Sequence, residues 1–158
     1  MSLFAHRNLP RLLLQAREAV LVHFRPGLRE HGLTDQQWRV LRVLAEEGEC
    51  DVSTIAQGAY LLGPSLSGVL TRMERDGLIL RSADAQDARR QLVRASAKGK
   101  RMVAKLAESI EAHYASMEAA LGKARLMQLY ALLDEVIAMP MPMPSDELPA
   151  QIAKRAKA

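Results

Sequence analysis

The side chains of this sequence that are best suited to bind a nucleic acid lie between residues 63 and 76. Apolar residues recur there at spacings of three and four, which predicts one buried helical face. They are Leu66, Val69, Leu70 and Met73. The other faces carry short hydroxyls and an arginine, namely Ser65, Ser67, Thr71 and Arg72. Hydroxyls can bond phosphates or base edges, and arginine can pair with both acceptors of guanine. We therefore interpret this segment as a helix that reads DNA, although Ser65 could instead cap its own helix.

A basic segment rich in turn-forming residues follows this helix and predicts a two-stranded hairpin. Gly77 suits the left-handed position just past a helix end. The apolar run at 78–80 and the run at 91–94 have the character of two short strands. Their connection carries Arg89 and Arg90. Arg89 suits a narrow minor groove, where the potential is most negative, so helix and hairpin together predict a winged-helix DNA reader.

The excess positive charge of the chain is concentrated in the same region. The 158 residues include 22 Lys and Arg against 18 Asp and Glu, a net charge of +4. Residues 63–101 hold nine basic and four acidic residues, a net +5, whereas residues 1–62 balance and residues 102–158 carry −1. A protein that neutralises phosphates needs such a local excess. The alternatives are ordinary surface charge, or a winged helix that binds another protein.

Composition indicates a mainly helical protein of about one domain. Hydrophobic residues make up 49% of the chain, which is ample for a core, and aromatic residues only 4%. No apolar run approaches the roughly 20 residues that span a bilayer, and we expect a cytoplasmic protein. We expect neither a cofactor nor an enzyme, because phosphate loops, metal-spaced clusters and nucleophile motifs are missing from the sequence. Cys50 is the sole cysteine, which excludes an internal disulfide and leaves a redox switch as an alternative.

Helices on the amino-terminal side must position this reader. The first is expected at 8–30, where Pro26 should bend or end it because proline lacks an N–H. Thr34 begins the next helix, Gln37 completes a capping box, and Gly48 ends it. The amide of Gln37 could alternatively donate to a DNA phosphate.

A short extended piece and a short helix lead into the reader. Residues 50–52 could add a strand to the hairpin, and Ser53 is expected to cap a helix at 54–59. Pro64 suits the first position of the reader helix, where its missing N–H has no partner. The predicted unit is a helix-turn-helix.

Two further amphipathic helices are expected at about 98–121 and 123–139, with a break at Gly122. A single reader domain cannot cover so many apolar faces, so a dimer interface is the natural use for them. The fold class is mainly α with a small β-wing. The predicted organisation is a dimerisation region at 8–30 and 98–139, a winged helix-turn-helix DNA-binding domain at 34–96 and a proline-rich tail at 140–158.

This pattern resembles the multiple-antibiotic-resistance regulator (MarR) family over about residues 8–139. The wing sequence at 84–89, Asp-Ala-Gln-Asp-Ala-Arg, matches the Asp-x-x-Asp-x-Arg pattern that the family favours, and the run at 69–79 also fits. Within this pattern we expect Asp87 to orient an arginine rather than touch DNA. The resemblance implies a homodimer that represses transcription from a palindromic double-stranded operator and leaves it when an aromatic ligand binds.

Residues 17–26 and 62–74 further resemble the subgroup that represses homoprotocatechuate degradation. This implies a small aromatic acid effector such as homoprotocatechuate or a hydroxyphenylacetate. Its carboxylate, phenolic oxygen and ring would need a cation, a hydrogen-bond partner and an apolar wall, for which the candidates are Arg17, His23 and Trp38. Arg17 and His23 lie about 120° apart around a helix, so they converge only if Arg17 reaches round or a second subunit contributes. The alternatives are a surface arginine and a packed histidine, or a regulator of a redox or multidrug stimulus.

Overall fold

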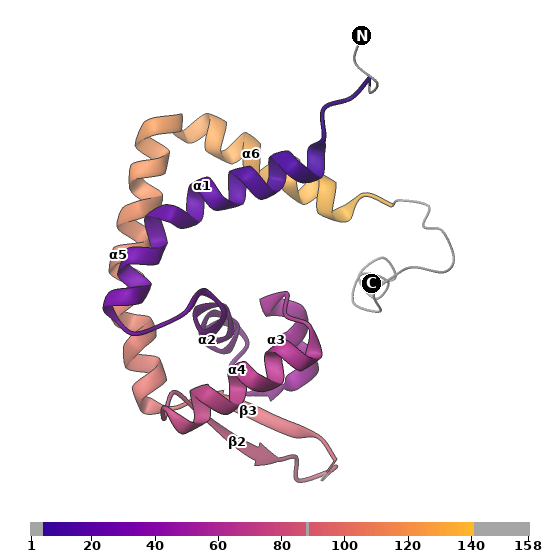
Figure 1. The fold of residues 1–158 in the computed structure, drawn as a ribbon, viewed down its shortest axis with the longest axis vertical. Coiled ribbons are helices and arrows are strands. Elements are labelled where there is room, and N and C mark those ends of the chain that lie inside the picture. The colour runs from indigo at the N-terminus through magenta and orange to yellow at the C-terminus, as the bar shows by residue number, and fades with distance from the viewer. Residues whose placement is uncertain (1–4, 88, 141–158) are drawn as a thin grey trace. The chain divides into compact units, whose positions relative to one another are not determined.

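The predicted order of helices and strands is present in the structure, a computed structural model that describes residues 5–87 and 89–140 (Figure 1). The described chain is mainly helical and carries one small antiparallel sheet, which confirms the predicted fold class. The elements are α1 (Leu9–Glu30), α2 (Asp35–Glu47), β1 (Cys50–Asp51), α3 (Val52–Ala59), α4 (Gly63–Arg75), β2 (Ile79–Ala83), β3 (Gln91–Ala95), α5 (Ala97–Leu121) and α6 (Lys123–Ala138).

The chain divides into two compact units, Met1–His113 and Tyr114–Ala158, with the boundary inside α5. The first unit holds α1 to α4, the sheet and most of α5. Apart from Pro140, the proline-rich tail predicted at 140–158 lies outside the described residues. The dimerisation role of 8–30 and 98–139 stays a prediction.

The ends of α1 and α2 follow from local capping. Asn8 caps α1 by accepting the N–H of Arg11 at 3.0 Å. Pro26 lies inside α1 and does not end it, because the helix continues to Glu30. The predicted capping box of α2 is confirmed, since the Thr34 hydroxyl accepts the N–H of Gln37 and the Gln37 side chain accepts the N–H of Thr34.

The start of α3 differs from the prediction. Its cap is Asp51, not Ser53, because Asp51 leaves β1 in an extended conformation and its Oδ1 accepts the N–H of Thr54 at 2.8 Å. The end of α3 is also unexpected, since Tyr60 closes it in the left-handed region with φ of +50°. A non-glycine residue there costs about 1–2 kcal/mol, so the surrounding structure must hold this turn.

The sheet has the order β1-β3-β2, with both pairings antiparallel. The predicted third strand at Cys50 is confirmed, and it lies opposite Val93. The hairpin β2–β3, residues 79–95, is the wing. It starts after a Schellman turn in which Leu78 N–H reaches the carbonyl of Met73 at 2.8 Å and Gly77 has φ of +71°. This turn fixes where the wing leaves α4.

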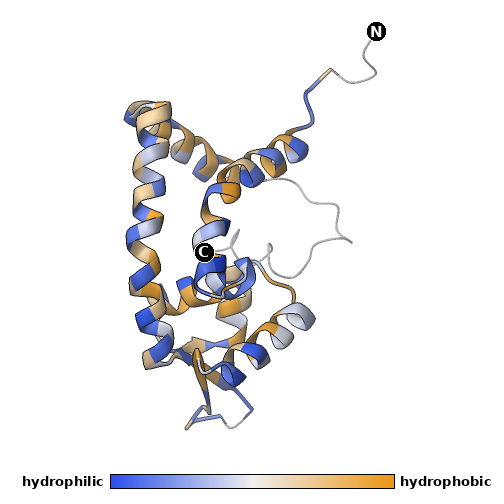
Figure 2. Cartoon of the chain, turned by 60° about the vertical axis from the view of Figure 1, so that its left-hand side comes forward, coloured by the Kyte–Doolittle hydropathy of each residue, from blue (hydrophilic) through white to orange (hydrophobic). Residues whose placement is uncertain are grey.

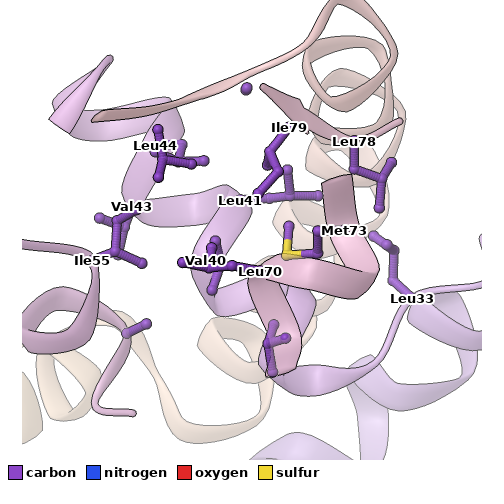
Figure 3. Packing of buried hydrophobic residues seen from close by; sticks show 14 of the residues in the cluster. Leu33, Val40, Leu41, Val43, Leu44, Ile55, Leu70, Met73, Leu78 and Ile79 are labelled. Carbon is purple, nitrogen blue, oxygen red and sulfur yellow. The ribbon is translucent and has the colours of Figure 1, made fainter. Parts of the chain in front are cut away.

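The core lies where α2, α4 and the sheet meet (Figure 3). The four apolar residues predicted to be buried in α4, Leu66, Val69, Leu70 and Met73, are each at most 1% exposed. Leu41 of α2 and Ile79 of β2 are fully buried with them. Burying such a side chain stabilises the fold by about 1.5–3 kcal/mol, so the orientation of α4 is set mainly by this face.

The first turn of α5 packs against the segment that joins α4 to β2. Ser96 donates to the carbonyl of Gly77 at 2.6 Å and accepts the N–H of Gly99 at 3.0 Å. Gly99 is so close to the chain after α4 that an added Cβ would lie 2.2 Å from the carbonyl oxygen of Leu78. Further along, Phe24 of α1 stacks near His113 of α5, with ring centroids 5.4 Å apart.

Many residues of α6 in the carboxy-terminal unit are hydrophobic (Figure 2). Several of their side chains are exposed. Leu126 is buried there. The exposed apolar residues of α6 are Met127, Leu129, Tyr130, Leu132, Val136 and Ile137. An exposed apolar surface of this extent is typical of one that another chain covers.

Gly99→Ala should destabilise the fold, because its Cβ meets backbone that cannot move cheaply. We expect a loss of about 1–3 kcal/mol in the free energy of unfolding, measured by urea denaturation at one fixed protein concentration. Gly63→Ala is the matched control, since it also lies in the first turn of a helix and its Cβ would meet nothing within 4 Å. Equal stability of the two variants would contradict the close approach of α5 to Leu78.

Candidate nucleic-acid interface

The outer face of α4 presents the residues predicted to contact DNA. Ser65, Ser67, Thr71 and Arg72 are all exposed. The capping alternative for Ser65 is wrong, because Leu62 occupies the cap position and no side chain caps this helix. Pro64 is the second residue of α4 rather than the first. The hydroxyl of Ser65 is therefore left for an external partner.

Thr71 is less available than its exposure suggests. Its hydroxyl donates to the carbonyl of Ser67 at 3.0 Å, and Arg81 Nη2 lies 3.4 Å from the same oxygen. This favours a role for Thr71 in holding α4 against the wing, with base contact left mainly to its neighbours on the helix.

Arg81 is a residue of the candidate interface that the sequence did not predict. Its guanidinium lies 3.2 Å from Glu74 of α4 and donates to Gln91 of β3 at 3.2 Å, and its side chain is only 16% exposed. It therefore joins the reader helix to both strands of the wing. The signal was present in the period of two along β2, which places Arg81 on the same face as the buried Ile79.

The wing carries one arginine that is held and one that is not. Arg90 forms a short ion pair with Asp51 and lies 3.8 Å from Asp84. Arg89 is exposed, and its side chain has no ion pair or hydrogen bond among the described residues. Among the described residues Asp87 forms no ion pair with an arginine side chain, although its charge, after the hydrogen bond to Asp51 and the charges of Asp51 and Asp84, helps to raise the pKa of Arg90. Its carboxylate accepts the backbone N–H of Arg89 at 3.0 Å and so shapes the turn.

Asp51 links this wing to the helix-turn-helix. One oxygen, Oδ1, caps α3 through Thr54, while Oδ2 accepts Arg90. The hydrogen bond from Arg90, followed by those from Thr54, lowers the pKa of Asp51 to about 2. The carboxylate therefore stays ionised well below neutral pH, and it fixes Arg90 against the body of the protein.

Gln37, a candidate for contact with a DNA phosphate, is not part of the candidate interface. Its side chain is 6% exposed and is used in the capping box of α2. A buried amide that already accepts a backbone N–H is poorly placed to meet a phosphate.

The three candidates for an effector site lie on α1 and α2. Arg17 pairs with Glu18 at 3.0 Å and with Asp35 at the start of α2 at 3.2 Å. Trp38 is half-buried, one turn further along α2, and packs against the core. His23 is exposed. Within residues 5–87 and 89–140, no hydrogen bond or ion pair joins His23 to Arg17, so these two remain separate in the single chain.

Cys50 is half-buried at the start of β1. Burial, and then the charges of Asp51 and Glu47, raises the pKa of the Cys50 thiol above its ordinary value. Because the thiolate is the reactive form, this environment disfavours the redox alternative. In the part of the chain that the structure describes, no three His, Cys, Asp or Glu residues gather as a metal site, and no helix could cross a membrane.

Asp51→Asn should separate the ionic role of Asp51 from its capping role, since asparagine caps helices equally well. The depressed pKa means that the ionic contribution is complete above about pH 4 and is lost as pH falls toward 2. The difference in unfolding free energy between wild type and Asp51→Asn, measured by denaturation from pH 6 downward, should shrink across that window. Glu49→Gln, which breaks the exposed pair with Arg94, is the control. A difference that persists unchanged to pH 2.5 would contradict the assignment.

Comparison with known proteins agrees with this geometry. A model of the MarR family matches residues 31–90, the stretch from the start of α2 to the turn of the wing. The homoprotocatechuate degradative operon repressor of Escherichia coli is 42% identical over 134 residues, which cover 85% of this chain and 90% of the repressor.

Solved structures agree as well. The transcriptional regulator PA4135 superposes with a TM-score of 0.82 at 40% identity, over 86% of this chain and 100% of the other. NadR in complex with 4-hydroxyphenylacetate superposes with a TM-score of 0.77 at 38% identity, over 86% and 96% of the two chains. Because the similarity includes both α4 and the wing and extends over most of each chain, this protein belongs to the MarR family of transcriptional regulators.

Proposed function

We propose that this protein is a transcriptional repressor that binds a palindromic operator as a homodimer and is released by a phenolic acid. The observation that carries the DNA part is the exposed face of α4 beside a wing whose Arg89 is unpaired among the described residues. We assign it to the cytoplasm, where its operator lies, and we assign it no catalytic activity.

The contacts divide by element. Ser65, Ser67 and Arg72 on α4 enter the major groove, where arginine can read guanine. Arg89 enters the minor groove next to it, where the negative potential favours a free guanidinium. Arg90, held by Asp51, keeps the wing in place and adds positive charge near the phosphates.

A dimer is supported by the apolar side chains that the single chain leaves exposed on α6 and on α1. Leu9, Leu13, Leu14 and Val22 are exposed on α1. Two readers related by a twofold axis then address half-sites roughly one helical turn, about 34–36 Å, apart.

A phenolic acid is favoured as the effector because the descriptions of two relatives name compounds of this class. The relative from Escherichia coli is named for homoprotocatechuate degradation, and NadR was solved with 4-hydroxyphenylacetate. In this chain Arg17 is the cation for the carboxylate, Trp38 is the apolar wall and His23 is the partner of the phenolic oxygen. His23 joins the other two only through movement or through the second subunit.

Arg89→Ala and Arg72→Ala should both weaken operator binding, by about 1–3 kcal/mol where a bidentate base contact is lost. Only Arg72→Ala should also relax base preference, because the wing arginine reads shape and charge. Gel shifts at physiological salt against a duplex that the wild type selects from random sequence provide the measurement. Arg29→Ala, an exposed arginine of α1, is the control.

Three results would contradict this proposal, each in a different part. Wild-type affinity in both variants would remove the reader assignment. A single half-site footprint together with a monomer mass in sedimentation would remove the dimer. Duplex binding that does not fall with salt would favour the alternative of a protein-interaction module.

Calorimetric titration tests the effector. Homoprotocatechuate and 4-hydroxyphenylacetate should bind and weaken operator binding, whereas protocatechuate and salicylate, with shorter side chains, should bind less. Arg17→Ala should weaken the binding of either ligand at least tenfold, or about 1.4 kcal/mol, because the carboxylate loses its cation. Absence of heat from all four acids in the wild type would show that the signal is of another class.

A further inference from the structure

A chain of polar contacts runs from α1 to the turn that precedes the reader helix. Arg17 Nη2 of α1 lies 3.2 Å from Asp35 Oδ2 at the start of α2. Arg39 Nε lies 3.4 Å from the same oxygen. Arg39 Nη1 then donates to the carbonyl oxygens of Ala59 at 2.7 Å and Tyr60 at 3.3 Å. All of these residues belong to one compact unit.

The far end of this chain is the point at which the reader helix is oriented. Ala59 is the last residue of α3, and Tyr60 closes the helix in a left-handed conformation that non-glycine residues seldom adopt. Leu62 then begins α4 without any side-chain cap. The guanidinium of Arg39 therefore satisfies carbonyls at the negative end of α3. It adds to the backbone hydrogen bonds of this turn, in which Tyr60 N–H donates to Gln57 at 3.3 Å and Leu61 N–H to Ala56 at 3.1 Å.

We propose that Arg17, Asp35 and Arg39 form the connection through which an anionic effector on α1 changes the position of the reader helix. The inference rests on the proposed function in one respect, which is that Arg17 receives the carboxylate of the effector. Arg39 is then a positioning residue, since it acts on DNA only through the α3–α4 turn.

The direction of the effect follows from the shared oxygen. In the free protein, one carboxylate oxygen of Asp35 divides its attraction between two cations. An effector carboxylate that draws Arg17 away leaves Asp35 with Arg39 alone, and the unshared attraction pulls the guanidinium from the carbonyls of α3. The turn loses the two hydrogen bonds from Arg39, the reader helix changes its position, and the operator is released. The effector thus favours one of two arrangements of the same contacts, as a population shift requires.

The test uses operator affinity in the absence of any effector, measured with the duplex selected by the wild type. Arg17→Ala should by itself mimic the effector and weaken operator binding about fivefold or more, the lower end of common allosteric couplings. The double variant Arg17→Ala/Asp35→Asn should regain most of the lost affinity, because the asparagine no longer pulls Arg39. A merely structural role for the ion pair can also give recovery in the double variant, because removing both partners leaves no uncompensated charge. In that case the loss and recovery of operator affinity follow the melting temperatures of the variants, whereas the proposed connection changes operator affinity at unchanged melting temperature.

Two further variants complete the design. Arg39→Gln should weaken operator binding whether or not Asp35 is replaced. Arg94→Gln, which loses an exposed ion pair with Glu49 elsewhere in the same unit, should leave the response to effector unchanged. Thermal melts of every variant at one concentration ensure that folded proteins are compared.

The outcomes separate this inference from the proposed function. Wild-type operator affinity in Arg17→Ala, or no recovery in the double variant, overturns the inference whatever the effector proves to be. Failure of 4-hydroxyphenylacetate to bind the wild type overturns the effector assignment and leaves the ligand-free result standing. If the ligand-free result and the effector assignment are both confirmed, Asp35→Asn alone should bind operator. Its operator affinity should then fall by a smaller factor on addition of 4-hydroxyphenylacetate than that of the wild type.

Discussion

The placement of the wing depends on a carboxylate that serves two elements at once. Asp51 lies at the junction of β1 and α3, and its two oxygens take part in different contacts, one with the first turn of α3 and one with Arg90. Through these two contacts Asp51 fixes the wing and the helix-turn-helix to the same point. Arg81 acts in a similar way between α4 and the hairpin. These polar contacts help to set the angle between α4 and the wing. The apolar core alone defines that angle less closely.

The sequence predicted those features that depend on neighbours a few residues away. The spacing of Leu66, Val69, Leu70 and Met73 predicted the buried face of α4, and Thr34 with Gln37 predicted a capping box, because both patterns repeat within one or two helical turns. The role of Arg90 could not be read in this way. Its partner Asp51 is 39 positions away, and they meet only because β1 pairs with β3 in one particular register. The wrong cap for α3 has a different origin, since Asp51 lies only three positions before Thr54. Asp51 both ends β1 and caps α3, so α3 begins earlier than predicted.

The sequence predicted which types of residue lie on the outer face of α4. It predicted less well which of their polar groups are available to contact DNA. An exposed hydroxyl or arginine on α4 follows from periodicity, and the four residues expected there are exposed. What periodicity cannot give is the competition among polar groups. Thr71 is partly engaged by Ser67 and Arg81, and Gln37 is consumed by the backbone of its own helix. A list of DNA-contacting residues predicted from the sequence is therefore too long, because a side chain that forms a hydrogen bond within the protein is less available to DNA.

The physical character of the two kinds of contact suits their different tasks. The core around Leu41, Leu70 and Met73 is fully buried, and a small ligand cannot supply the energy to rearrange it. Half-exposed ion pairs such as Arg17 with Asp35 contribute only about 0–1 kcal/mol each to stability. The coupling between an effector and an operator is usually about 1–3 kcal/mol, which is the scale on which a few such pairs can be exchanged. In the proposed connection, exchanging such pairs moves α4 only as far as its buried face allows, because Leu70 and Met73 stay packed in the core.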